Sequence, residues 1–427
     1  MGEVLELAER AWRGELEETQ VHPANALVGF EELEEGLGFM SAFSNVAVLD
    51  TAEGLVLLDT SSFFHARRLH QEVRRWRDGR VHTAVYSHGH VDHVFGLGPF
   101  EEEARGRGWP PIQVIAHESC PARFERYRLT HGYNAIINQR QFGFDEPVFP
   151  RRFRQPDRTL RTDQDLDVGG VRIELHHDKG ETDDHLWAWI PAQQALYTGD
   201  LFIWASPNCG NPQKVQRYPR EWARALRRMQ ELPARWLLPG HGPPICGARR
   251  VQQALGEAAE LLESLCEQTL RRMNEGARLD EILHSLELPE RLLERPYLRP
   301  SYDDPRFIVR NLWRLYGGWY DGNPARLSPA PDADLARQVA GLAGGAPALA
   351  ERAGQLAGEG RLDLACHLAE WAAQAAPADA GVQRLRAAIY RERAGMESSL
   401  MARGIYTAAA RLSESLSQSP AAEEPEA

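Results

Sequence analysis

The sequence lacks the features that would direct a chain to a membrane or to an oxidising compartment. Only 5 of its 427 residues are cysteines, an odd number without a C-x-x-C pair, which is typical of free thiols in a reducing compartment. No apolar run approaches the roughly 20 residues of a membrane-spanning helix. The acidic start, Met1–Glu18, has neither the basic nor the apolar region of a signal peptide. We therefore expect a cytoplasmic protein without membrane spans.

Basic charge is also scarce relative to acidic charge. The chain has 49 Lys and Arg residues against 61 Asp and Glu residues, which gives a formal net charge of -12 at pH 7. Binding to a nucleic-acid backbone needs clustered Lys and Arg, so we expect no nucleic-acid partner. A hydrophobic fraction of 43% with 26% charged residues is ordinary for a globular protein. The length predicts two domains.

The first half of the chain alternates strand-like and helix-like segments. Short apolar runs at Val46–Leu49 and Leu55–Leu58 flank a short polar turn and predict a hairpin. A helix-like stretch, Phe64–Trp76, precedes a strand at Thr83–Tyr86. Further strands are predicted at Val171–Leu175, Leu186–Ile190 and Ala195–Tyr197. This mixture predicts an α/β fold in which helices cover sheets.

After Pro244 the strand signals stop and apolar residues recur at helical spacing. We therefore predict an α/β domain over residues 1–247 and an all-α domain over residues 248–412, built from helical hairpins. The last segment, residues 413–427, is rich in Ser, Pro and Glu, and we expect it to be a disordered tail.

The main chemical signal lies in one short segment. Ser87–His93 reads Ser-His-Gly-His-Val-Asp-His and places three imidazoles and a carboxylate within six residues. Neutral imidazole is a good zinc ligand, and a carboxylate adds the negative charge that holds a second divalent cation. In an extended loop His88 and His90 point to one side, whereas Asp92 and His93 lie where the loop turns into the next helix. We therefore expect the segment to bind two metal ions, in preference to forming a solvated loop.

Three later positions have the same character, because each places a ligand-type residue at the end of an apolar run. They are His185 in Gly-Glu-Thr-Asp-Asp-His, Asp200 in Leu-Tyr-Thr-Gly-Asp, and His241 in Leu-Pro-Gly-His-Gly. Glycine lets the backbone pass close to an ion where a side chain would obstruct it. We expect a carboxylate such as Asp59, Asp183 or Asp184 to fix the imidazole tautomers.

Taken together, these motifs resemble those of the metallo-beta-lactamase superfamily: H-x-H-x-D-H, then a His, a Gly-Asp and a Pro-Gly-His-Gly. The resemblance implies a four-layer αβ/βα sandwich over roughly residues 20–247. It further implies one metal held by His88, His90 and His185, a second held by Asp92, His93 and His241, and Asp200 bridging both.

A second resemblance concerns the helical region. The segment Leu312–Pro324 is similar to part of the dimerisation domain of alkyl sulfatases, and the likeness extends over about Ala248–Leu412. It implies a homodimer formed through the C-terminal helical domain. The segment His131–Arg140 resembles the one near the sulfate pocket of alkyl sulfatases, which implies substrate binding by Asn134 and Arg140. A surface helix with routine polar residues is an equally good interpretation of that segment.

These features predict a dinuclear metal-dependent hydrolase of small-molecule sulfate esters. Two divalent ions, expected to be Zn²⁺, would lower the pKa of a bridging water and supply hydroxide as the nucleophile. Asp92 would orient that water. The expected ligands His185 and Asp200 stand where the alkyl sulfatases resembled here have Glu, which favours a carboxylic ester, thioester or lactone hydrolase as the alternative. A non-catalytic scaffold with structural metals is a third interpretation, but structural zinc sites are usually closed tetrahedral cages.

Overall fold

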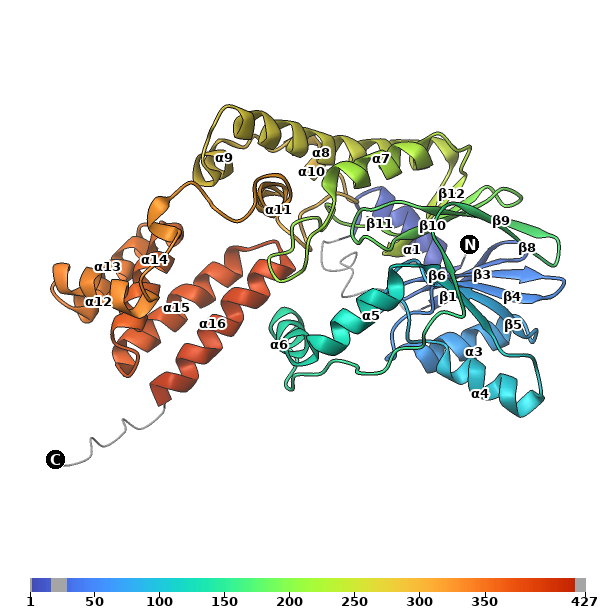
Figure 1. Ribbon diagram of the computed structural model, residues 1–427, viewed down its shortest axis with the longest axis horizontal. Helices are drawn as coiled ribbons and strands as arrows, with labels where there is room; N and C mark the ends of the chain where they lie inside the picture. Colours follow the sequence, from blue (N-terminus) through green and yellow to red (C-terminus); the bar gives the residue numbers. More distant parts are fainter. Residues whose placement is uncertain (1, 17–28, 419–427) are drawn as a thin grey trace. The chain divides into compact units, whose positions relative to one another are not determined.

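The computed structural model describes residues 2–16 and 29–418 (Figure 1). Contacts within the chain divide it into two compact units. The first contains the residues up to Asn134 together with Phe149–Trp319, and the second contains Ala135–Val148 together with the residues from Tyr320 onward. Among the described residues, no helix combines the length and the apolar character needed to cross a bilayer.

The first unit contains a seven-stranded sheet whose strands lie in sequence order. The neighbours from β1 to β4 are antiparallel and those from β4 to β7 are parallel. The hairpin predicted from the sequence is confirmed, because β3 and β4 pair with Ala47 opposite Leu58. The strands are β1 (Gly29–Glu34), β2 (Leu37–Ser41), β3 (Val46–Thr51), β4 (Gly54–Leu58), β5 (Val81–Val85), β6 (Gln113–His117) and β7 (Arg158–Leu160).

A six-stranded sheet completes the strands of this unit, in the order β13-β12-β11-β10-β9-β8. Only the β11 and β12 pair is parallel, and the other neighbours are antiparallel. The three strands predicted in this region are confirmed as parts of β9, β10 and β11. The strands are β8 (Gln164–Val168), β9 (Val171–His177), β10 (Leu186–Ile190), β11 (Ala195–Ile203), β12 (Trp236–His241) and β13 (Ile245–Cys246).

The central strands of both sheets, such as β2 and β10, are buried on both faces. In β3, Ala47 and Leu49 face the core between the sheets, whereas Val46 and Val48 face an outer core. Successive strand side chains point to opposite faces, so each sheet needs a helical cover on its outer side. Figure 1 shows α3 and α4 beside the first sheet and α7 and α8 beside the second. The four-layer αβ/βα sandwich predicted by resemblance is therefore confirmed.

Helices from distant parts of the chain supply these covers. The first sheet packs against α3 (Ala66–Trp76), α4 (Gly98–Arg107) and α5 (Cys120–Leu129). The second packs against α1 (Glu3–Trp12), α7 (Pro219–Gln230), α8 (Ala248–Asn274), α10 (Glu290–Leu293) and α11 (Arg306–Gly317). A small hydrophobic cluster of Leu279, Ile282 and Val309 joins α9 (Leu279–Ser285) to α11.

We predicted a domain boundary at residue 247, whereas the first compact unit continues to Trp319. Leu255 and Leu261 of α8 and Leu312 of α11 share one core with Trp187 and Trp189 of β10. Without these helices the outer face of the second sheet would expose large apolar side chains to water, at a cost of roughly 25 cal/mol per Å². The helical region therefore begins inside the first unit.

The second unit consists of helical hairpins, as predicted. Its helices are α12 (Asp332–Leu342), α13 (Ala346–Gly358), α14 (Leu362–Ala375), α15 (Ala380–Met396) and α16 (Leu400–Gln418), preceded by a 3₁₀ helix at Pro324–Arg326. The C-terminal part of α6 (His131–Phe142) belongs to the same unit, because a side chain at Gly404 would lie 2.7 Å from the carbonyl oxygen of Arg140.

The predicted tail is partly helical. We expected disorder from residue 413, but α16 continues to Gln418. The reason is a buried polar contact: Ser413 is fully buried, accepts a hydrogen bond from Arg386 Nη1 at 2.6 Å and donates one to Gln383 Oε1 at 2.7 Å. Residues 419–427 lie outside the described part of the chain.

Candidate metal centre

Loops at the ends of neighbouring strands bring the ligand-type side chains together. The segment His88–His93 follows β5, Glu181 lies between β9 and β10, Asp200 lies in β11 and His241 ends β12. The parallel pairing of β11 with β12 places Ile203 opposite His241. A backbone hydrogen bond of 2.6 Å from Leu186 to Ser87 joins the loops of the two sheets. The centre is therefore built across both sheets.

Seven side chains form two groups in which the ligand atoms lie within 4.8 Å of one another. The first group is His88, His90, Glu181 and Asp200, and the second is Asp92, His93 and His241. Asp200 faces both groups, because its Oδ1 lies 3.2 Å from His93 Nε2 and its Oδ2 lies 3.3 Å from His241 Nε2 and 3.8 Å from His88 Nε2.

The donor atoms of these groups suit divalent cations. His93 Nε2, Asp200 Oδ1 and Glu181 Oε2 are buried and make no hydrogen bond. Burying a polar atom costs free energy unless a hydrogen bond or a bound ion replaces its contacts with water. Four imidazoles and three carboxylates in two adjoining groups are a nitrogen and oxygen ligand set that zinc and similar ions prefer. The residues present therefore fit divalent metal binding.

Burial and neighbouring charges shift the pKa values of the ligand-type side chains in different directions. Burial lowers the pKa of His88 and of His90 well below the ordinary value, which favours neutral rings. In the structure His88 Nε2 and His90 Nδ1 share a hydrogen bond of 2.8 Å. Burial opposes the ionisation of Asp200, yet the attraction of His241 and His93 holds the pKa of its carboxyl well below the usual range. Burial would also lower the pKa of His93, but Asp200 and the neighbouring carboxylates raise it.

The structure places His185 differently from our expectation. His185 Nε2 accepts a hydrogen bond of 3.1 Å from the backbone N–H of Asp200, so this lone pair is already used. Its ring stacks on that of His88, with centroids 4.9 Å apart, and it joins neither group. Glu181 stands in its place, with Oε2 3.2 Å from His90 Nδ1 and 3.6 Å from His88 Nε2. Glu and His are both ligand types in this loop, and the sequence pattern alone did not choose between them.

Asp59 fixes the orientation of His93. Its Oδ2 lies 2.7 Å from His93 Nδ1, and it also accepts hydrogen bonds from the hydroxyl groups of Ser87 and Tyr197 at 2.6 and 2.7 Å. Asp59 adopts a left-handed φ of 60°, a conformation that costs free energy in residues other than glycine. The carboxylate therefore holds Nδ1 as the protonated nitrogen and directs Nε2 into the centre.

Asp183 and Asp184, the other carboxylates considered, contact no imidazole in the described hydrogen bonds. Asp184 is buried, accepts a hydrogen bond of 2.9 Å from the backbone N–H of Gly89 and pairs with Arg123 Nε at 2.8 Å. Asp183 pairs with the same arginine. Asp184 thereby supports the loop between His88 and His90 instead of a histidine ring.

Two glycines keep the centre open, as the sequence suggested. A Cβ at Gly240 would lie 2.1 Å from Asp200 Oδ1, and one at Gly199 would lie 2.7 Å from His185 Cε1. Gly199 also has a φ of +49°. Asn45 supports the same region, because its Nδ2 donates to the carbonyl oxygens of Pro239 at 2.9 Å and Gly242 at 2.7 Å.

Two cations beside the centre were not found by the sequence reasoning. Arg217 is buried, and its Nη2 lies 2.7 Å from Glu181 Oε1. Lys214 is half-buried and interacts electrostatically with Arg217, Glu181 and Asp92. Burial and the repulsion from Arg217 lower the pKa of Lys214 to about 8. Both residues lie in a loop with no metal motif, so the sequence carried no signal for them.

The two predicted substrate-binding residues lie outside both groups. Asn134 Nδ2 donates to the carbonyl oxygen of Thr130 at 3.0 Å and to its Oγ1 at 2.7 Å, so the half-buried side chain is bonded to the residue that precedes α6. Arg140 lies on α6 in the second unit. Their role in substrate binding stays a prediction.

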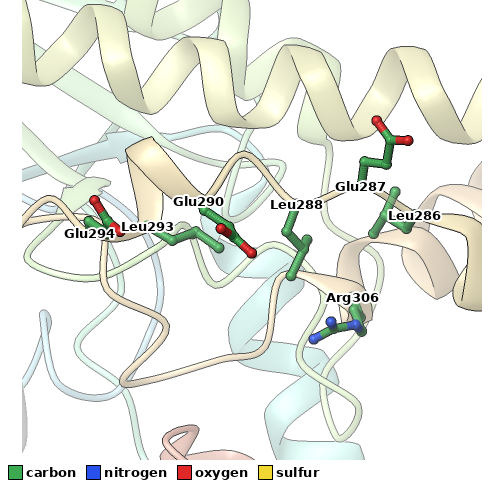
Figure 2. Close-up of a pocket in the computed structure, with 7 residues that line it drawn as sticks. All are labelled: Leu286, Glu287, Leu288, Glu290, Leu293, Glu294 and Arg306. Carbon is green, nitrogen blue, oxygen red and sulfur yellow. The ribbon is translucent and has the colours of Figure 1, made fainter.

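A separate surface pocket of about 540 Å³ lies in the helical part of the first unit (Figure 2). Three leucines, three glutamates and one arginine line it: Leu286, Leu288, Leu293, Glu287, Glu290, Glu294 and Arg306. None of these residues belongs to either ligand group. The pocket is therefore distinct from the candidate metal centre.

Comparisons with known proteins agree with this architecture. The model of the metallo-beta-lactamase superfamily matches residues 42–241, and that of alkyl sulfatase dimerisation matches residues 278–415. A linear primary-alkylsulfatase of Pseudomonas sp. is 26% identical over 76% of this chain and 65% of its own length. An (R)-specific secondary-alkylsulfatase of Pseudomonas sp. is 25% identical over 81% of this chain and 56% of its own length.

A solved structure has the same fold. The stereoselective inverting sec-alkylsulfatase Pisa1 from Pseudomonas sp. matches with a TM-score of 0.82 at 23% identity, over 91% of this chain and 66% of the other. The chain spans about two thirds or less of the length of these three relatives. On the two family matches and the shared fold, the chain combines a metallo-beta-lactamase superfamily domain with an alkyl sulfatase dimerisation domain.

Proposed function

We propose that the protein is a metal-dependent hydrolase of sulfate esters with two divalent ions. The observation that carries the proposal is the pair of adjoining ligand groups joined by Asp200, with the cations Arg217 and Lys214 beside them. The similarity to proteins named alkylsulfatases over about three quarters of the chain supports the same reaction class.

We propose His88, His90, Glu181 and Asp200 as ligands of one ion, and Asp92, His93, His241 and Asp200 as ligands of the other. Glu181 takes the role first expected of His185. Zinc suits this set of nitrogen and oxygen donors. Bound divalent ions would activate water and polarise the ester oxygen.

Asp92 is the proposed catalytic carboxylate. Its Oδ2 lies 3.4 Å from His93 Nε2 and 3.5 Å from His241 Nε2, while 20% of its side chain is exposed. It is thus the carboxylate of the set most open to solvent, and a water molecule can reach it. In this position it can accept a proton from water while it holds an ion.

Lys214 and Arg217 are candidates for the cations that a sulfate group requires. The chain contains only two lysines, Lys179 and Lys214, so almost every other cationic side chain is an arginine. Lys214 has no ion pair among the described salt bridges, whereas Arg217 is paired with Glu181. We propose that Lys214 attracts the anionic substrate, and we retain Asn134 and Arg140 as further candidates.

A carboxylic ester, thioester or lactone hydrolase is the second candidate. The sequence favoured it because the expected ligands His185 and Asp200 stand where the alkyl sulfatases have Glu. Glu181 now supplies a glutamate at that position, and Asp200 alone remains as the departure that favours this candidate.

We also propose that the protein forms a homodimer through its C-terminal helices, within the region that the alkyl sulfatase dimerisation model matches. All five cysteines are free in the structure, which supports a location in the reducing cytoplasm.

The test measures sulfate release by purified protein of known metal content from short primary and secondary alkyl sulfates, beside matched carboxylic esters and thioesters. We expect sulfate release that is lost in His88→Ala and in Asp92→Asn. Turnover of esters without sulfate release would favour the second candidate. A metal-loaded protein that hydrolyses none of these substrates would favour a scaffold with structural metals.

A further inference from the structure

The carboxylate of Glu181 is held in one orientation by Arg217. Nη2 of Arg217 lies 2.7 Å from Oε1 of Glu181, and its Nη1 donates to the carbonyl oxygen of Asn208. Because Oε1 is bound to the guanidinium, Oε2 is the oxygen that faces His88 and His90. The position of Arg217 therefore decides which oxygen the metal centre receives.

Arg217 is in turn held by a residue far away in the sequence. Asn311 of α11 donates from Nδ2 to the carbonyl oxygen of Arg217 at 2.9 Å. Its Oδ1 accepts from Gln216 Nε2 at 2.9 Å, and the side chain is only 6% exposed. A buried amide with both ends bonded has one favoured orientation, since breaking either bond leaves an unsatisfied polar group.

Residues 299–314, which include most of α11, also contact the rest of this loop. The backbone N–H of Ser206 donates to the carbonyl oxygen of Arg299 at 2.9 Å, and Arg314 Nε donates to Gln216 Oε1 at 2.9 Å. The backbone at Gly210 lies so close to α11 that a Cβ at this position would be 2.2 Å from the carbonyl carbon of Phe307. Residues 299–314 follow the part of the chain that the metallo-beta-lactamase model matches, yet they clamp the loop that carries Arg217.

We propose that Asn311 is a positioning residue for the metal centre, which acts through Arg217 to present Glu181 Oε2 to the ion beside His88 and His90. The proposal rests on the proposed metal-binding function of this site. It extends the functional unit beyond the sandwich into α11, because Asn311 of that helix bonds the backbone of Arg217.

The test is a double-mutant cycle on zinc affinity, measured by competition with a chromogenic chelator on the full chain. We expect Asn311→Ala to weaken one of the two zinc sites by roughly 10- to 100-fold, the range found for residues that orient metal ligands. Arg217→Ala should weaken the same site, and the double variant should bind zinc no more weakly than Arg217→Ala alone. Arg310→Ala, an exposed neighbour on α11, should bind zinc like the wild type.

Additive losses in the double variant, or unchanged zinc affinity in Asn311→Ala, would overturn the proposal. Thermal unfolding monitored by circular dichroism identifies variants that fail to fold. Asn311→Asp keeps the acceptor for Gln216 but cannot donate to the carbonyl oxygen of Arg217, and it decides the question if the alanine variant does not fold: weaker zinc binding is expected, and wild-type affinity would contradict the proposal.

Zinc affinity needs no substrate, so the two proposals fail separately. A wild type that binds two zinc ions and releases no sulfate would overturn the proposed function and leave the role of Asn311 open to the same zinc measurement. Sulfate release that persists in Asn311→Ala with unchanged zinc affinity would overturn only the role of Asn311.

Discussion

Arg217 and Glu181 form a buried ion pair, with Nη2 and Oε1 2.7 Å apart and only 4% and 1% of the two side chains exposed. Burial raises the pKa of Glu181 to about 7, and the attraction of Arg217 opposes this rise. The arginine thus favours the ionised carboxylate that a metal ligand must be. This ion pair links the loop after β9 with the loop after β11.

Glu181→Gln should remove one metal ion per chain, because the neutral amide is a poor ligand and leaves Arg217 buried without its partner. His185→Asn should retain both ions, since the imidazole accepts a hydrogen bond from the backbone N–H of Asp200 and joins neither ligand group. Metal content after dialysis against a weak chelator, measured by mass spectrometry, checks both variants. Loss of metal from the His185 variant alone would restore the ligand set expected from the sequence.

Asp59→Asn should weaken zinc binding by roughly 10- to 100-fold. The amide cannot accept equally from Ser87, Tyr197 and His93, so His93 loses the contact that keeps Nε2 directed at the centre. Chelator competition measures the effect. Asp183→Asn serves as the control, because 44% of that side chain is exposed and it pairs only with Arg123 in the described contacts.

Gly240→Ala should abolish binding of at least one ion while the fold persists. The new methyl group would occupy space 2.1 Å from Asp200 Oδ1, and 2.7 Å from the backbone of Gly199, so the carboxylate must move. Gly98→Ala is the matched control, since nothing lies within 4 Å of its Cβ position. Equal zinc content in the two variants would argue against Asp200 as a shared ligand.

Asp303→Asn should stabilise the protein increasingly as the pH rises from 5 to 8. Burial raises the pKa of Asp303 to about 8 from 3.8, against the attraction of Arg217. Between these values the folded state holds a proton that the unfolded state has released, so stability falls as pH rises. Asparagine mimics the protonated acid and removes this dependence.

The gain for Asp303→Asn should increase by up to about 4 kcal/mol between pH 5 and pH 8, because each of these three pH units corresponds to about 1.4 kcal/mol. Urea unfolding at both pH values measures it. A stability difference that is the same at both values would show that the carboxyl group titrates normally in the folded protein.

Lys214→Ala should raise KM for an anionic ester by roughly tenfold, the effect of about 1.4 kcal/mol, with little change in kcat. Lys214→Arg should retain most of the affinity, because the charge is kept. Initial rates over a range of substrate concentrations separate the two constants. An unchanged KM would exclude Lys214 from substrate binding, and Lys179→Ala controls for the loss of a lysine.

The sequence was most informative where its signals are local. Short apolar runs predicted the β3–β4 hairpin and the strand β10, because a strand buried on both faces forms a continuous apolar run of a few residues. The segment His88–His93 carried several ligand types in one loop, and the structure brings all four of them into the ligand groups.

The tertiary structure decided what depends on contacts between distant segments. In the structure Glu181 joins the first candidate ligand group and His185 does not, and His185 Nε2 accepts a hydrogen bond from the backbone N–H of Asp200. The helices α8 and α11 belong to the first compact unit because their apolar side chains pack in one core with those of β10. The sequence by itself determined the class of fold and most of the ligand types, because periodicity and local motifs are properties of neighbouring residues. Only the folded chain brings Asn311, Arg217 and Glu181 together, because their hydrogen bonds join segments that no local pattern relates.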